Sequence, residues 1–464
     1  MDSVDLSGLP RLAGIGSYAQ CAQLGYTVTQ DVDRLIRYGW LEKQAMELGL
    51  AWLNPTPEWE VKEALSLHLY LDAQHAGWIR ERVSEMRNPA PRMDVSPSPE
   101  LKAFIDELLT AQDTLEKIVG LYGVLKPALL AAYRLHFSQA QPLVDHPTRR
   151  MLRMIIADEE ETMEWGQAAA VAVCATSGAK ARAEAWSAHL QAYLRAAGGI
   201  MGDEPGPGNL PPSRVTEAFQ PDFFPRRDER FESQWNFVFP PHEVARMDGV
   251  PADEKTLALM CKRALEMDVP EVMARMMLEA KSQPWDYYMQ MSRQLWDEAR
   301  HAMMGTVYLE AHGVDWRKIP IHAGFSLRLN QHLNAVEAHA VLYAIEQSLM
   351  PATTGKRYEW ATAGESHDAL AQFFQDYDWA DEVLHVRIGR ECLLMSLKLS
   401  QEEAVKLGQR CATASEAALQ NYEARGTQIN WWPDFVRQVL GKESAVLTYT
   451  LGTADPVYRS ADSG

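Results

Sequence analysis

Two short stretches of this chain repeat one motif, Trp296-Asp297-Glu298-Ala299-Arg300-His301 and Ala380-Asp381-Glu382-Val383-Leu384-His385. Each contains Glu-x-x-His with an aspartate directly before the glutamate. Residues three apart on an α-helix project from the same face, so each Glu/His pair is able to bind one metal ion. Two such pairs, each on its own long helix, are typical of a four-helix bundle that holds two metal ions, in which each of the other two helices contributes one glutamate.

The composition is that of an ordinary globular protein. The chain has 464 residues, enough for two or three domains, with 47% apolar and 23% charged residues. A net charge of −18 argues against nucleic acid or an anionic membrane as partner. We find no signal peptide pattern and no apolar run of membrane-spanning length, so a cytoplasmic location is expected. The five cysteines are scattered without C-x-x-C spacing, which favours neither disulfides nor a zinc or iron–sulfur site.

The order of elements predicts an all-α protein with no strand. Residues 28–197 have the pattern of long helices with few breaks. A Pro/Gly-rich stretch follows over residues 198–252, which we interpret as an interdomain connection. The helical pattern then resumes. We therefore expect a helical domain over 1–197, the connection over 198–252, and a second helical domain with a C-terminal tail over 253–464.

The two halves resemble each other in short matches. Ala157-Asp158-Glu159, with Gly166 seven residues past the glutamate, matches Ala380-Asp381-Glu382 with Gly389. Asp72-Ala73-Gln74-His75 matches Glu298-Ala299-Arg300-His301. These matches indicate an internal duplication of a four-helix unit.

The first copy lacks part of the ligand set. Thr162 occupies the position where a second histidine is expected, and its third helix offers no carboxylate at the level of Leu125 and Pro127. We therefore expect no di-metal site there and interpret the first copy as a scaffold. The candidate donors that remain are Glu42, Asp72, His75 and Glu159.

The other ligands of the second copy follow from levels along two helical hairpins, since each helical residue rises about 1.5 Å. For a turn near Gln283, Glu298 lies 15 residues after the turn, Glu266 lies 17 before it and Glu279 only 4 before it. Glu266 is therefore the better ligand, with a kink expected at Pro270.

For a second turn near Glu365, Glu382 lies 17 residues after it, Glu346 lies 19 before it and Glu337 lies 28 before it. This favours Glu346. The predicted metal ligands and catalytic residues are Glu266, Glu298, His301, Glu346, Glu382 and His385.

These six positions resemble the ferritin-like di-iron carboxylate superfamily. The Asp-Glu-x-Arg-His form at 297–301 looks most like its oxygen-activating branch, the bacterial multicomponent monooxygenase hydroxylases and the ribonucleotide reductase small subunits. The resemblance covers residues 253–400 and, more weakly, 28–197. It implies two tandem ferritin-like four-helix bundles with a degenerate first copy, Glu266 and Glu346 as single-carboxylate ligands, and iron or iron with manganese as the metals. Oxygen-rich ligands with one imidazole per ion also suit Fe or Mn better than structural zinc.

Three charged residues beside the motifs are candidates for a supporting role. A metal-bound imidazole commonly donates its other N–H to a carboxylate. We expect Asp381 to serve His301 and Asp297 to serve His385, with Arg300 holding the two aspartates. The alternative is that these are charges on exposed helix faces. Gly305 and Gly389 each follow a ligand glutamate by seven residues; they permit either close helix packing or room beside the metals, and the second interpretation is narrowly preferred.

The expected function is an O₂-dependent oxidoreductase, a non-haem di-iron oxygenase or oxidase that acts on a small organic substrate with dioxygen. An external electron donor and a homodimer are left open. The alternatives are a ferroxidase or other iron-handling protein, a rubrerythrin-like peroxide reductase, and a helical binding protein with an incidental metal.

Overall fold

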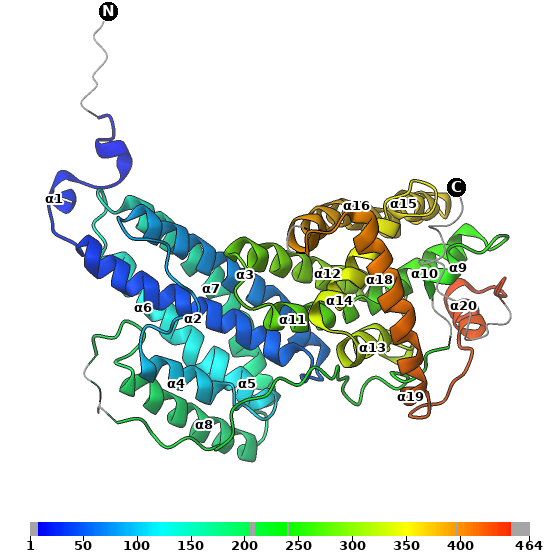
Figure 1. The fold of residues 1–464 in the computed structure, drawn as a ribbon, viewed down its shortest axis with the longest axis horizontal. Helices are drawn as coiled ribbons and strands as arrows, with labels where there is room; N and C mark the ends of the chain where they lie inside the picture. The colour runs from blue at the N-terminus through cyan, green and yellow to red at the C-terminus, as the bar shows by residue number, and fades with distance from the viewer. Residues whose placement is uncertain (1–7, 205, 207–208, 239–240, 395–396, 447–464) are drawn as a thin grey trace, which may run out of the picture. The chain divides into compact units, whose positions relative to one another are not determined.

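All regular secondary structure is helical in the part of the chain that the computed structural model describes, residues 8–204, 206, 209–238, 241–394 and 397–446 (Figure 1). The all-α prediction is confirmed, and these residues form no strand. The chain divides into two compact units, Met1–Leu48 with Leu71–Gln220, and Gly49–Tyr70 with Pro221–Gly464. The residues 49–70, which the sequence places in its first domain, pack with the second unit. The tail from residue 447 onward lies outside the described residues.

Two long helices, α2 and α3, belong to both units, because the end of α2 and the start of α3 lie within residues 49–70 of the second unit. The break between them at residues 54–58 is where Asn54-Pro55-Thr56-Pro57 predicts it. The helices of this part are η1 (Leu12–Gly14), α1 (Tyr18–Cys21), α2 (Val28–Leu53), α3 (Trp59–Glu85), α4 (Pro99–Leu108), α5 (Thr114–Gly120), the π-helical turn η2 (Leu121–Leu125), α6 (Lys126–Gln139), α7 (His146–Val173) and α8 (Ser177–Ala196).

The second unit contains the remaining helices. They are α9 (Pro241–Val244), α10 (Ala252–Leu265), α11 (Asp268–Glu279), α12 (Trp285–Ala311), η3 (Trp316–Lys318), α13 (Gly324–His332), α14 (Ala335–Ser348), α15 (Lys356–Glu365), α16 (Ala369–Gly389), the π-helical turn η4 (Arg390–Leu394), α18 (Gln401–Glu416), η5 (Ala417–Leu419), α19 (Gln420–Glu423) and α20 (Trp432–Leu440).

Several helices are shorter than their sequence pattern suggests. In the first unit, breaks at residues 109–113 and 174–176 separate α4 from α5 and α7 from α8. Each new helix begins behind a side-chain cap: Asp113 accepts a hydrogen bond from the Glu116 amide, and Thr176 accepts one from the Ala179 amide. Such caps satisfy backbone donors that a helix start leaves unpaired. A short polar residue can therefore start a new helix within a stretch whose apolar pattern looks continuous.

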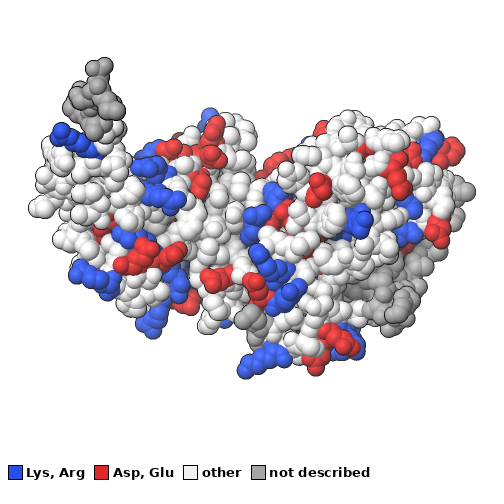
Figure 2. Space-filling view, turned by 90° about the horizontal axis from the view of Figure 1, so that it is seen from above, with Lys and Arg blue, Asp and Glu red and all other residues white. Residues whose placement is uncertain are grey.

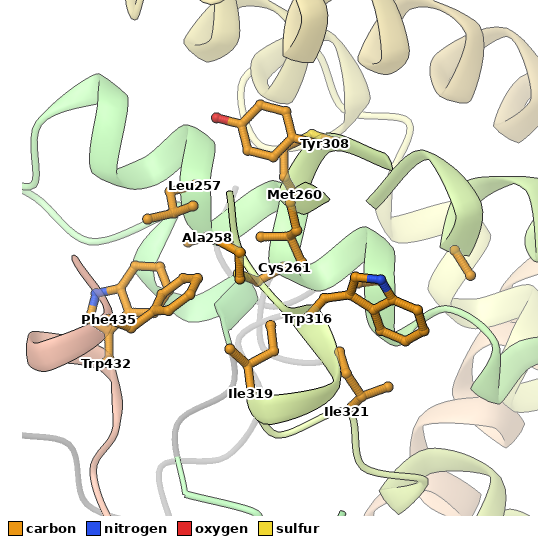
Figure 3. Close-up of a cluster of buried hydrophobic side chains, with 14 of the residues drawn as sticks. Leu257, Ala258, Met260, Cys261, Tyr308, Trp316, Ile319, Ile321, Trp432 and Phe435 are labelled. Atoms are coloured by element: carbon orange, nitrogen blue, oxygen red, sulfur yellow. The ribbon is translucent and has the colours of Figure 1, made fainter. Parts of the chain in front are cut away.

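The core of the second unit is organised around α10. Leu257, Met260, Cys261 and Ala264 recur at helical spacing and are buried. They belong to one apolar cluster with Tyr308 of α12 and with residues after α12 and in α20, including Trp316, Ile319, Ile321, Trp432 and Phe435 (Figure 3). This packing fixes the end of α10 against α12.

One stretch of the first unit, Thr114–Gln139, is long and apolar enough to cross a membrane, with a mean hydropathy of 1.3, although no such run was expected. That mean hydropathy is the value for an 18-residue window of the stretch, and 67% of the window is buried, as for a core helix of a folded domain. On the face shown in Figure 2, basic and acidic side chains are interspersed.

Candidate metal centre

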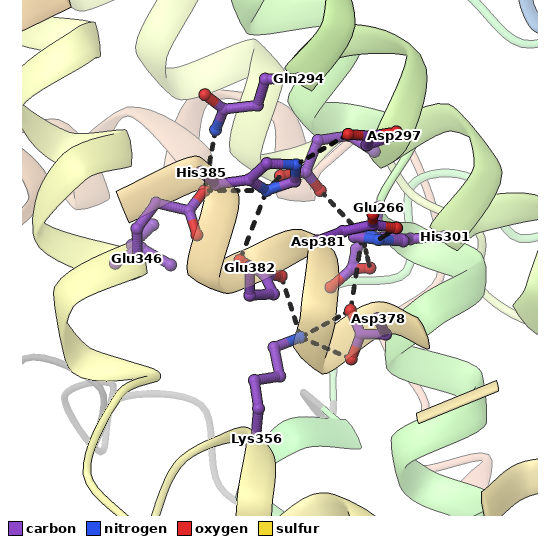
Figure 4. Close-up of polar contacts among 12 residues, drawn as sticks. Glu266, Gln294, Asp297, His301, Glu346, Lys356, Asp378, Asp381, Glu382 and His385 are labelled. Carbon is purple, nitrogen blue, oxygen red and sulfur yellow. Dashed lines mark hydrogen bonds and ion pairs between the residues drawn. The ribbon is translucent and has the colours of Figure 1, made fainter. Parts of the chain in front are cut away.

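Four helical segments of the second unit bring the six sequence-predicted ligands together (Figure 4). α12 carries the first Glu-x-x-His motif and α16 the second, while the end of α10 and the last turn of α14 supply one glutamate each. Both histidines are fully buried, and only Glu266 is partly exposed. The six residues are Glu266, Glu298, His301, Glu346, Glu382 and His385.

The potential ligand atoms form overlapping clusters. One consists of Glu298, Glu346, Glu382 and His385, and a second of Glu266, Glu298 and His301, with the ligand atoms of each cluster within 4.8 Å of one another. Glu298 belongs to both. Glu382 also joins His301 in a third cluster within the same limit. Glu298 and Glu382 therefore each belong to two of the clusters.

The helix hairpins differ from those expected. Helix α10 ends at its C-terminal cap Glu266, and a new helix, α11, starts at Asp268. An interruption between two helices therefore replaces the kink expected near Pro270. α14 ends at Ser348, and the separate helix α15 lies between it and α16. The single turn assumed near Glu365 is therefore wrong. Glu346 reaches the centre because α14 packs directly against α16.

The two carboxylates that were rejected for lying at the wrong level have other partners. Glu279 is exposed and accepts a hydrogen bond from Arg275, 2.9 Å away. Glu337 caps the start of α14 by accepting from the amide of Asn334. Neither appears in a metal-ligand cluster of the described residues.

The two imidazoles have the orientation of metal ligands. Nδ1 of His301 lies 3.5 Å from Glu298 and 3.7 Å from Glu266, whereas its Nε2 faces Asp381 at 3.3 Å. Nδ1 of His385 lies 3.3 Å from Glu298 and 3.5 Å from Glu382. In each ring one nitrogen therefore faces the carboxylate cluster.

The outer nitrogen of each imidazole lies beside the aspartate of the other motif, but only that of His301 is hydrogen-bonded to it. Asp297 Oδ2 lies 3.5 Å from Nε2 of His385. Arg300 donates to Asp381 at 2.9 Å and also to Asp297. Arg293, which the sequence analysis did not single out, donates to Asp297 at 2.8 Å. A carboxylate held in this way fixes the tautomer and the direction of the ring behind it.

Three charged residues of the centre were missed by sequence reasoning. Asp378 lies one turn before Glu382 on α16, with Oδ1 3.4 Å from Nδ1 of His301. The fully buried Lys356, at the start of α15, contacts Asp378 at 2.8 Å and Glu382 at 3.0 Å. Arg263 of α10 contacts Glu266 at 2.7 Å and Asp378. The i, i+4 spacing of Asp378 and Glu382 was the one available signal; nothing marked Lys356.

Gln294, also missed, donates to Glu346 at 3.1 Å. It lies one turn before Glu298 on α12, so it faces the same side of that helix. The same oxygen, Oε1, lies 3.9 Å from Nδ1 of His385.

The donor set fits divalent ions. Several buried atoms in it have no hydrogen-bond partner among the described residues, although buried polar atoms are ordinarily paired. They are Nδ1 of His301, both ring nitrogens of His385 and Oε2 of Glu266, Glu346 and Glu382. Four carboxylates and two imidazoles match the oxygen-rich preference of Fe and Mn.

The pKa shifts describe the protein without ions. Burial raises the pKa of Glu266 to about 7 and, with Glu382 beside it, that of Glu346 well above its usual value. Burial alone would lower the pKa of His301, but Asp378, Asp381 and Glu298 raise it to about 9. Protons therefore balance part of the carboxylate charge when no ion is bound.

The two glycines near the centre provide close packing rather than open space. A Cβ on Gly305 would lie 2.1 Å from the backbone nitrogen of Ala264, so this glycine lets α12 approach α10. A Cβ on Gly389 would lie 2.5 Å from the ring of Tyr343. The preferred expectation of room beside the metals is therefore wrong at both positions.

Comparison of the chain with known family models, curated proteins and solved structures finds no match.

Proposed function

We propose that this protein is an O₂-dependent oxidoreductase that uses two iron ions, or one iron and one manganese, to oxidise or oxygenate a small organic substrate. One observation carries the proposal: two buried imidazole nitrogens face four carboxylates in overlapping clusters that share Glu298. A single ion would not require two histidines on separate helices with a carboxylate common to both.

The arrangement also supports a ferritin-like fold for the second unit. α12 packs against α10, α11 and α16, and α14 packs against α11 and α16. We infer a four-helix bundle in which α10 and α11 together form the first helix, interrupted at Glu266. The matched motifs of the first unit support a tandem copy of the same bundle.

The six ligands would be distributed over the two ions. Glu266 and His301 would hold one ion, Glu346 and His385 the other, and Glu298 and Glu382 would contact both. When bound, two reduced ions supply the electrons that activate dioxygen. Asp381, hydrogen-bonded to Nε2 of His301, would hold that imidazole in the ligating tautomer, and Asp297, 3.5 Å from Nε2 of His385, would do the same there once an ion draws the ring into place. Arg300 contacts both aspartates.

Lys356 and Arg263 place two fixed positive charges on the Glu266 side of the centre. They balance the excess of carboxylates and keep Glu382 ionised. Burial would raise the pKa of Glu382, but the Lys356 ammonium holds it well below its usual value. This carboxylate is thus ready to bind an ion without losing a proton.

Electrons are proposed to come from an external donor, because the scattered cysteines provide no iron–sulfur site. We propose a cytoplasmic location.

The test begins with metal analysis of the purified protein. An anaerobic sample loaded with Fe(II) is then exposed to O₂ with and without candidate substrates, and O₂ uptake and products are measured. Substrate-dependent O₂ uptake with an oxidised product supports the proposal. Oxidation of many Fe(II) ions per chain without any substrate would indicate iron handling, and rapid loss of added peroxide would indicate a peroxide reductase. Absence of metal binding would overturn the proposal.

A further inference from the structure

The first unit contains a second buried cluster of metal-ligand type. Glu42 of α2, Asp72 and His75 of α3 and Glu159 of α7 have ligand atoms within 4.8 Å of one another. All four side chains are at most 2% exposed. By composition and burial alone, this cluster resembles a site for one divalent ion.

A lysine side chain occupies this cluster. Lys126, the first residue of α6, is 1% exposed. Its Nζ donates to Asp72, and to Glu159 at 2.5 Å, and lies 3.8 Å from Glu42. The ammonium therefore contacts all three carboxylates, as a bound cation would.

The histidine of the cluster has the same surroundings as His301 of the second unit. Nε2 of His75 lies 3.1 Å from Asp158, as Nε2 of His301 lies 3.3 Å from Asp381. Nδ1 of His75 lies 3.6 Å from Glu42, as Nδ1 of His301 lies 3.7 Å from Glu266. The short matches between the two halves of the sequence thus correspond to matching side-chain geometry.

A glycine–tyrosine contact aligns the third helices of the two units. A Cβ on Gly166 would lie 2.5 Å from Tyr122, and one on Gly389 would lie 2.5 Å from Tyr343. These glycines follow Glu159 and Glu382 by the same seven residues. The two tyrosines therefore occupy equivalent positions.

Counting from these tyrosines identifies the counterpart of Lys126. Glu346 follows Tyr343 by three residues, and Lys126 follows Tyr122 by four. The π-helical turn Leu121–Leu125 includes Tyr122 and ends directly before Lys126. A π-helical turn has more residues than an α-helical one, which accounts for the one extra residue between Tyr122 and Lys126. Lys126 consequently takes the position of the metal ligand Glu346.

We propose that Lys126 replaces a metal ion in the first unit: its ammonium is the resident cation of the Glu42, Asp72, His75 and Glu159 cluster, which binds no divalent ion until Lys126 is exchanged for a carboxylate. The inference does not depend on the activity of the second unit. It also explains how three buried carboxylates persist there, because a buried charge needs a compensating partner.

The charges of the cluster agree with this assignment. Burial would lower the pKa of His75, but Glu42, Asp158 and Glu159 raise it well above its usual value. Burial raises the pKa of Asp72 well above its usual value despite the contact with Lys126. Both shifts are in the direction that reduces the net negative charge around Lys126.

The experiment measures metal binding in the full chain with the second site removed by Glu298→Ala/His385→Ala. Each variant is equilibrated with Mn²⁺, desalted and analysed for metal, and its thermal unfolding is compared with and without EDTA. We expect no bound ion in this background. Adding Lys126→Glu should give about one Mn²⁺ per chain and a melting temperature that EDTA lowers. The control Lys126→Arg, which keeps the positive charge, should bind none.

Three results would overturn the proposal. The first is an ion bound in the background with Lys126 intact and lost on His75→Ala. The second is a folded Lys126→Glu variant that binds no Mn²⁺. If Lys126→Glu does not fold in EDTA, it is refolded with Mn²⁺: ion-dependent folding supports the proposal, and failure in both conditions is the third contradicting result.

Discussion

Nζ of Lys356 lies 3.0 Å from Oε1 of Glu382, a carboxylate that belongs to clusters on both sides of the candidate centre. The same ammonium contacts Asp378 at 2.8 Å and is fully buried. Burial alone would lower the pKa of Lys356, but these carboxylates raise it above its usual value. The centre thus contains a permanent positive charge of its own, which compensates Asp378 and Glu382 whether or not ions are bound.

Lys356→Met should destabilise the ion-free protein by about 3–5 kcal/mol, because it removes the cation that contacts buried Glu382 and leaves Asp378 with Arg263 alone. A divalent ion would supply part of the missing charge, so the rise in melting temperature on adding Mn²⁺ should be larger in the variant than in the wild type. Lys255→Met is the matched control, since Nζ of Lys255 donates to the Tyr358 hydroxyl and not to a buried carboxylate among the described residues. Equal Mn²⁺-induced shifts in Lys356→Met and wild type would argue against this role.

The purified protein should contain about two Fe or Mn ions per chain, all in the second unit. Glu298→Ala or His385→Ala should lower the metal content because each removes a ligand, and elemental analysis measures the loss. Thr162→Ala, at the corresponding position of the first unit, should leave it unchanged. Full metal loading of Glu298→Ala/His385→Ala would show that the ions bind elsewhere.

Glu266→Gln should reduce both metal content and O₂ reactivity, since Oε2 of Glu266 lies beside Nδ1 of His301. Glu279→Gln is the control on the next helix, and it should have little effect because Glu279 is exposed and contacts Arg275. Metal analysis and O₂ uptake of the two variants test this. A larger loss of metal and O₂ reactivity in Glu279→Gln than in Glu266→Gln would mean that Glu279, and not Glu266, is the metal ligand.

Gly389→Ala should lower stability by about 1–3 kcal/mol, because its new methyl group would overlap the Tyr343 ring. Gly178→Ala is the control: a Cβ there meets nothing within 4 Å, and alanine favours a helix. Denaturant unfolding of both variants gives the comparison. A Gly389→Ala protein as stable as the wild type would show that Tyr343 moves aside freely.

Metal affinity should rise with pH between about 6 and 9. Without ions, His301 has a pKa of about 9 and Glu266 one of about 7, so both hold protons at lower pH. An ion must displace these protons, and its affinity falls by about tenfold per pH unit for each one displaced. Calorimetry in buffers of different ionisation enthalpy counts the protons released. No proton release at pH 6 would contradict the assignment of these two ligands.

Sequence spacing identified the residues that meet in the centre because a helix fixes which residues share a face. Glu298 and His301, like Glu382 and His385, project together once their segments are helical, whatever surrounds them. The same reasoning placed Asp381 near His301 and Asp297 near His385, which is the arrangement in the structure. Local geometry thus determined the motif side chains and their immediate supports.

The tertiary structure alone decided how the remaining charges are compensated. Counting residues from the expected turn identified Glu346 as a ligand. It did not predict the separate helix α15, whose first residue, Lys356, contacts Glu382 in the centre. In the first unit, Lys126 was passed over between Leu125 and Pro127, although it contacts Asp72 and Glu159. A lysine side chain is long and flexible, so its partners depend on which helices pack around it and leave no periodic signal in the sequence. The sequence by itself therefore determined the helical class and the ligand types, and packing determined where the helices break and which lysine contacts which buried carboxylates.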